Sequence, residues 1–166
     1  MALAMNNLTV KQSLDDCTVE LESIQKIIDV FGKSHSIVPY LTNYAIIKCT
    51  GTIENSFKSI ISDFHNTLPK QAKKYIDTTF TNSSMNPSKD NICKSLLRFD
   101  EEWNKNFKAK LASKADKEKI ESSLKSLNDA RNEFAHGGYP KVSFLSVKTY
   151  FEDSKKIIEY LDDIIK

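Results

Sequence analysis

Residues 130–138, ARNEFAHGG, place an arginine and a histidine five positions apart near the end of a predicted helix. Arg131 is one of two arginines in the chain, and His136 is one of three histidines. A guanidinium group can bind a phosphate through two parallel hydrogen bonds, which a lysine ammonium cannot do. An imidazole titrates near neutral pH and can therefore take up or release a proton during a reaction. Together these residue types suit the binding or cleavage of a phosphate ester.

Arg131 is predicted to lie on the apolar face of its helix. Counting 100° per residue from Ile120, Leu124 falls at about 40° and Leu127 at about −20°, which defines this face. Arg131 falls at about 20°, in the middle of it. A guanidinium cannot lose its charge, and burying it without a partner is strongly destabilising. We therefore expect Arg131 either to contact a carboxylate or to open onto a cleft that binds an anion.

Asn132 and His136 are expected to share a polar row beside this face, because they are four residues apart. Gly137 and Gly138 end the helix and free the backbone to turn the imidazole toward Arg131. The arginine, the asparagine and the histidine would then line one concave spot. The alternative is structural: Arg131 forms an ion pair, and His136 caps the carbonyl groups of a helix end that favours a cation.

The elements that position these residues are predicted to be helices throughout. Glycine and proline number only four each, which argues against a sandwich or barrel of short strands. Apolar residues at helical spacing predict six helices, approximately at residues 13–31, 38–65, 69–80, 89–111, 116–136 and 143–165. The turn-rich segment 81–91 is the one long loop expected. The fold class is therefore all-α, a compact bundle of five to six helices in a single domain over residues 1–166, of which 1–12 are expected to be flexible.

Composition argues against several other kinds of site. Cys17, Cys49 and Cys93 are far apart, and none lies at a metal-ligand spacing from a histidine, so we expect free thiols, no metal and no cofactor. No long apolar run or secretory leader is evident, so no membrane contact and a cytoplasmic location are expected. Seven lysines between positions 105 and 125 predict either a surface that attracts a polyanion or a solvated helix face. His35 and His65 are expected to be surface or capping residues.

The segment ARNEFAHGG resembles the R-x4-6-H motif of HEPN domains, which are small all-α modules that include many metal-independent ribonucleases. Asn132 fits this resemblance, because Asn, Asp or His typically follows the arginine in that family. A second segment, KCTGTIENSFKSII (residues 48–61), resembles the long second helix of one branch, the RiboL-PSP-like group, at Gly51 and Glu54. The MAE-type HEPN group is a close second.

The resemblance implies a symmetric homodimer in which two copies of the motif face each other across a cleft. His136 would be the general acid and base. Arg131 would hold the scissile phosphate while the ribose 2′-hydroxyl attacks it, leaving a 2′,3′-cyclic phosphate. Asn132 and Glu54 would support the site. We expect Glu54 to pair with Arg131 or to orient the site, unless it is an ordinary residue at the edge of the apolar face.

Two classes of function remain open besides a purely structural helical protein. An endoribonuclease would act on RNA in a toxin-like, stress or anti-phage system, with a cognate antitoxin or effector as a further partner. A non-catalytic module of the same fold would use Arg131 and His136 to bind RNA, a nucleotide or another protein. A shared fold does not decide between them.

Overall fold

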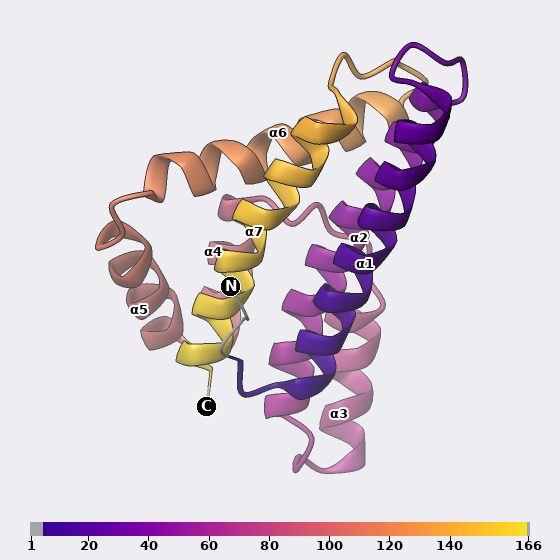
Figure 1. Ribbon diagram of the computed structural model, residues 1–166. Helices are drawn as coiled ribbons and strands as arrows, with labels where there is room; N and C mark the ends of the chain where they lie inside the picture. Colours follow the sequence, from indigo (N-terminus) through magenta and orange to yellow (C-terminus); the bar gives the residue numbers. More distant parts are fainter. Residues whose placement is uncertain (1–4, 166) are drawn as a thin grey trace.

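The computed structural model describes residues 5–165, which contain helices and no strand, so the all-α prediction is confirmed (Figure 1). The helices are α1 (Leu8–Phe31), α2 (Val38–Phe64), α3 (Lys70–Ile76), the π-helix η1 (Asp77–Thr81), α4 (Lys89–Phe99), α5 (Glu101–Ala112), α6 (Lys117–Ala135) and α7 (Phe144–Ile164). Within the described residues, no helix is both long and apolar enough to span a membrane.

Helix α7 runs through the middle of the bundle. It packs against α1, α2, α5 and α6, and Figure 1 shows it between α1 and α5. Helices α2, α5 and α7 bury large aromatic side chains in one common core, namely Phe57, Phe107 and Phe151. Burying a side chain of this size stabilises the fold by about 1.5–3 kcal/mol. The central position of α7 lets α6 pack onto both α2 and α7.

Helix α1 begins at Leu8 rather than at the predicted Ser13. Asn7 caps it, because its side-chain oxygen accepts a hydrogen bond from the Val10 amide (3.0 Å). The backbone amide of Asn7 also donates to the carboxylate of Asp162 on α7 (3.0 Å). Residues 8–12, which we expected to be flexible, are therefore helical. Residues 1–4 of that predicted segment lie outside the described residues.

The single helix predicted over residues 89–111 is wrong: the chain forms two helices that meet at Asp100. The backbone of Asp100 is extended (φ −159°, ψ 123°). Its carboxylate accepts hydrogen bonds from the amides of Glu102 (2.7 Å) and Trp103 (3.3 Å). An acidic cap of this kind stabilises the start of a helix, so α5 begins here in a new direction.

The connection between α3 and α4 brings a loop to the candidate site. Helix α3 continues into η1, and residues 82–88 follow as an irregular loop. Phe80 anchors η1, because its ring packs edge-on against Phe57 of α2 (5.7 Å between ring centroids) and Phe99 of α4 (5.0 Å). The loop therefore starts beside α2 and ends at the first residue of α4.

Candidate functional site

Arg131 lies on α6 where the helical spacing predicts it, and its side chain is half-buried. The apolar residues that define this face, Ile120, Leu124 and Leu127, are fully buried. The guanidinium Nη1 donates to Asn132 Oδ1 (3.3 Å), and no carboxylate of residues 5–165 lies within the 4.0 Å of an ion pair. An arginine has five N–H donors, so most of its hydrogen-bonding capacity is left for an external anion.

Asn132 connects Arg131 to the loop of residues 82–88. Its Oδ1 accepts hydrogen bonds from Arg131 and from Asn86 Nδ2 (3.2 Å). An amide oxygen has two lone pairs and can accept both bonds. The backbone carbonyl of Asn86 in turn accepts a hydrogen bond from Asn91 Nδ2 on α4 (2.9 Å). Asn132 therefore fixes the guanidinium relative to a loop that is itself held by α4.

Glu54 forms no hydrogen bond or ion pair with Arg131, so of the two roles expected for it, pairing with Arg131 or orienting the site, the first is wrong. It forms an ion pair with Lys58, one turn along α2 (2.5 Å), and the two side chains are 16% and 5% exposed. Glu54 Oε1 also accepts the Met85 amide (2.9 Å), and Lys58 Nζ donates to the Ser83 carbonyl oxygen. The ammonium of Lys58 neutralises the carboxylate, and both groups hold the loop rather than the arginine.

Glu54 thus reaches the motif only through this loop. Met85, bound by Glu54, is followed directly by Asn86, which binds Asn132. Sequence analysis missed Lys58 and Asn86. Lys58 could have been found, because residues four apart on a helix are neighbours. Asn86 could not, since no periodicity relates a loop residue to a helix more than forty positions later.

His136 ends α6, and its imidazole is exposed. Its backbone amide donates to the Asn132 carbonyl oxygen (3.0 Å), but its side chain makes no hydrogen bond, ion pair or ring contact within the described part of the chain. Gly137 has a positive φ of 82°, and Gly138 donates to the Glu133 carbonyl oxygen (2.8 Å), as in a Schellman helix end. The glycines therefore stop the helix, and no group of the described residues fixes the imidazole relative to Arg131.

His65 is the C-cap residue of α2, in line with the expected capping or surface position, but its ring is half-buried. Its ring stacks on Phe99 (5.4 Å between centroids) and lies 6.0 Å from the buried Trp103. Its Nε2 is buried without a hydrogen-bond partner, and burial lowers the pKa of the imidazole. The half-buried aromatic environment of His65 arises only where the end of α2 meets α4 and α5, so no local sequence pattern predicts it.

Ion pairs partly neutralise the lysine-rich segment 105–125. Four of its lysines have acidic partners: Lys105 with Glu102, Lys110 with Asp163, Lys119 with Asp153 and Lys125 with Asp129. The pairs of Lys105 and Lys125 are exposed on both sides and contribute only about 0–1 kcal/mol each, so a polyanion could displace them. Among the described residues, no group of three or more His, Cys, Asp or Glu side chains gathers in a way that could hold a metal ion.

Comparison with protein families gives a match to RiboL-PSP-HEPN over residues 12–166. No curated protein and no solved structure gives a significant match. The matched range contains both resembling segments, the long second helix with Glu54 and the Arg131–His136 motif at the end of α6. The chain belongs to the RiboL-PSP-HEPN family.

Proposed function

We propose that this protein is a metal-independent endoribonuclease in which Arg131 and His136 act on RNA. The observation that carries the proposal is the half-buried guanidinium of Arg131, which is oriented by an amide and has no carboxylate partner among residues 5–165. A guanidinium in this state can bind a phosphodiester and stabilise the extra negative charge of its transition state. The frequency of ribonucleases among HEPN domains supports the same assignment.

In the proposed reaction the ribose 2′-hydroxyl attacks the adjacent phosphorus. A neutral imidazole accepts the hydroxyl proton, and a protonated imidazole donates a proton to the leaving 5′-oxygen. The products are a 2′,3′-cyclic phosphate and a 5′-hydroxyl. Arg131 holds the non-bridging oxygens, and Asn132 keeps the guanidinium in place.

We propose that the working unit is a homodimer. The reaction needs a base and an acid, and the motif of one chain supplies a single imidazole, which no described residue of the same chain orients. Two copies of His136 facing each other across an interface would supply both. Light scattering measures the mass in solution. A monomer whose cleavage rate per molecule does not change with protein concentration would contradict a composite site.

The test of catalysis is cleavage of a fluorescent single-stranded RNA in the presence of EDTA. Replacement of a general acid–base group typically costs about 10²–10⁴ in rate, so we expect His136→Ala and Arg131→Ala each to lose at least about a hundredfold. The matched controls are Arg98→Ala and His35→Ala, which remove an exposed arginine and an exposed histidine. Full activity of His136→Ala, or loss of wild-type activity in EDTA, would contradict the proposal.

A toxin-like role in the cytoplasm, held in check by a cognate antitoxin or effector, is part of the same proposal. Expression of the wild-type chain should then slow the growth of its host, and expression of His136→Ala should not. Growth curves at matched protein levels decide this point. If both proteins slow growth equally, the toxicity does not depend on RNA cleavage.

The exposed and unoriented imidazole of His136 favours one alternative, a non-catalytic RNA-binding module. In that case Arg131→Ala should weaken RNA binding, whereas His136→Ala should leave it unchanged and no product should form. Binding measured with uncleaved RNA beside the cleavage assay distinguishes the two functions.

A further inference from the structure

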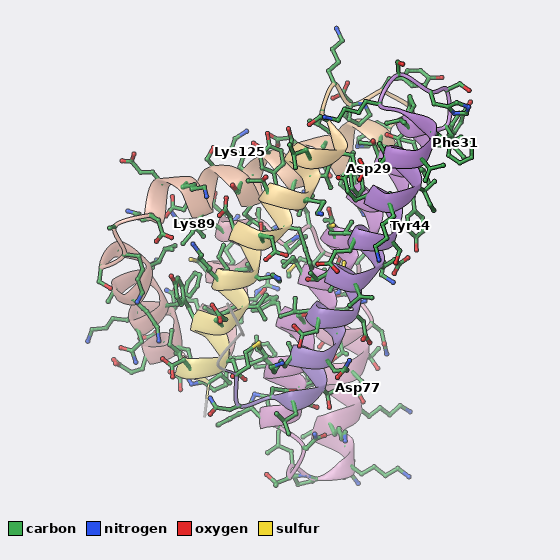
Figure 2. The ribbon with its side chains drawn as sticks, viewed as in Figure 1. Asp29, Phe31, Tyr44, Asp77, Lys89 and Lys125 are labelled. Atoms are coloured by element: carbon green, nitrogen blue, oxygen red, sulfur yellow. The ribbon has the colours of Figure 1, made fainter. Side chains whose placement is uncertain are left out.

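A pocket of about 560 Å³ borders the motif where α4 approaches α6. Its lining includes Glu121, Lys125 and Asn128 from α6, and Asn86 and Lys89 from the opposite side. Figure 2 shows Lys125 on α6 and Lys89 below that helix in the same view. Because Asn86 also binds the side chain that orients Arg131, the pocket adjoins the candidate site.

Three buried polar atoms in this pocket lack hydrogen-bond partners. Asn128 is only 3% exposed, and neither its amide nitrogen nor its amide oxygen makes a hydrogen bond. Asn86 Oδ1 is buried and also lacks a hydrogen bond, whereas the Glu121 carboxylate is paired with the Lys89 ammonium (3.0 Å). Leaving a buried polar group unpaired is destabilising by about 1–3 kcal/mol. Three such atoms around one pocket are therefore best explained by a ligand that completes their hydrogen bonds.

We propose that this pocket binds the guanine base of an RNA strand whose phosphate contacts Arg131. The inference rests on the proposed function and specifies which RNA the site prefers. The unpaired atoms are one donor, the Asn128 amide nitrogen, and two acceptors, the amide oxygens of Asn128 and Asn86. The Glu121 carboxylate becomes a third acceptor if its pair with Lys89 opens. The pocket volume lies within the usual range for small-ligand sites.

Guanine matches this set better than the other bases. Its Watson–Crick edge carries N1–H and an exocyclic amino group as donors beside the O6 acceptor. Adenine and cytosine carry only the amino group as a donor on that edge, and uracil only N3–H. Bases of single-stranded RNA are commonly read on this edge by amide and carboxylate side chains.

Entry of a base requires a side chain to move, because the unpaired atoms are covered. We assign this movement to the ion pair of Lys89 with Glu121 (3.0 Å), which lines the pocket and whose side chains are 39% and 25% exposed. Moving the Lys89 side chain would uncover the Glu121 carboxylate for the base. The Lys89 ammonium and that of Lys125, whose side chain is 77% exposed, are then placed to contact the flanking phosphates.

The experiment measures binding of 2′-O-methyl oligonucleotides, which cannot be cleaved by attack of the 2′-hydroxyl. Oligouridines with one central guanosine, adenosine or cytidine are compared by fluorescence anisotropy. A well-placed pair of hydrogen bonds discriminates between bases by at least about fivefold, so we expect the guanosine oligonucleotide to bind at least that much more tightly. Cleavage of the corresponding unmodified RNAs tests the same preference.

Asn128→Leu should abolish the preference without lowering the Tm, because leucine fills similar space and removes two unpaired polar atoms. The matched control is Asn55→Leu, at an exposed asparagine of α2, which should keep the preference.

The possible outcomes separate this inference from the proposed function. Cleavage that ignores base identity would overturn the guanine site and leave the ribonuclease. Guanine-selective binding without cleavage would support the guanine site and overturn the ribonuclease. An Asn128→Leu protein that keeps the preference but has a lower Tm would assign Asn128 a structural role. Absence of both binding and cleavage would overturn both proposals.

Discussion

Removing one partner of the Glu54–Lys58 ion pair should destabilise the protein strongly, whereas removing both should not. The two side chains are 16% and 5% exposed, and the Met85 amide and the Ser83 carbonyl bind them from the loop. Glu54→Gln leaves a buried ammonium whose charge is offset only by carbonyl and amide oxygens. Lys58→Met leaves a partly exposed carboxylate that keeps one amide donor.

Breaking a buried pair from one side is destabilising by about 3–5 kcal/mol. We expect about 3 kcal/mol for Glu54→Gln, because the glutamine can still accept the Met85 amide. In a domain of this size, each kcal/mol lowers the Tm by about 2–4 °C, so the loss should be about 6–12 °C. In the double variant Glu54→Gln/Lys58→Met neither charge remains, so its stability should return to within about 1 kcal/mol of the wild type.

Urea unfolding followed by circular dichroism on the four proteins gives the coupling energy of the pair, which should exceed about 2 kcal/mol. The matched control is the pair of Lys11 with Asp15 (2.6 Å), which has the same helical spacing but side chains that are 32% and 42% exposed. Its coupling should be about 0.3–0.5 kcal/mol. A buried pair that couples no more strongly than this surface pair would refute the reasoning.

Three further predictions follow from single residues. Burial lowers the pKa of His65, so its contribution to stability should be fully present above the ordinary histidine pKa of about 6.5 and be lost as the pH falls through the lowered pKa. Urea unfolding at pH 7.5 and pH 5 measures this loss, and His65→Phe should remove it. The hydrogen bond to Cys17 and burial raise the pKa of the Cys49 thiol, and both of these cysteines are buried. A thiol reagent should therefore label at most Cys93 in the native protein, and all three cysteines in urea. Gly138→Ala should lower the free energy of unfolding by about 1 kcal/mol or more, because a Cβ there would lie 2.9 Å from the Glu133 carbonyl oxygen. Gly51→Ala should instead raise it by about 0.5–1 kcal/mol, because a Cβ at this position of α2 would meet no other atom.

The parts of the fold that sequence analysis predicts are those with a long helical repeat. Helices α2, α6 and α7 begin and end within a few residues of the predicted positions, because each buries an unbroken apolar stripe. The break at Asp100 was missed because apolar spacing continues on both sides of it. A local signal did indicate the break. Asp100 is followed by two glutamates, which is a common start of a helix, because the aspartate side chain accepts hydrogen bonds from the first backbone amides of the helix.

In the candidate site, too, helical spacing predicts some residues and misses others. Helical spacing places Arg131 on the buried face and Asn132 beside it, and the structure agrees with both. Spacing along one helix cannot tell which other element covers that face. Helices α2 and α7 pack against α6, and the element that reaches Asn132 is an irregular loop, which is positioned by a buried ion pair on α2 and bound through Asn86. The predicted partner, Glu54, was therefore assigned to the wrong cation.

The use of an amide rather than a carboxylate beside Arg131 has a chemical consequence. A carboxylate in contact with the guanidinium would compete with phosphate, and a hydrogen bond to a charged group is worth about 1.5–3 kcal/mol, which an incoming anion would have to replace. The Asn132 amide orients the guanidinium without neutralising it. The carboxylate of Glu54 is neutralised by Lys58 instead, and its positioning effect reaches the motif through the neutral groups of Met85 and Asn86. This separation of positioning from charge leaves the guanidinium of Arg131 without a competing carboxylate, which is the state that the proposed binding of an RNA phosphate requires.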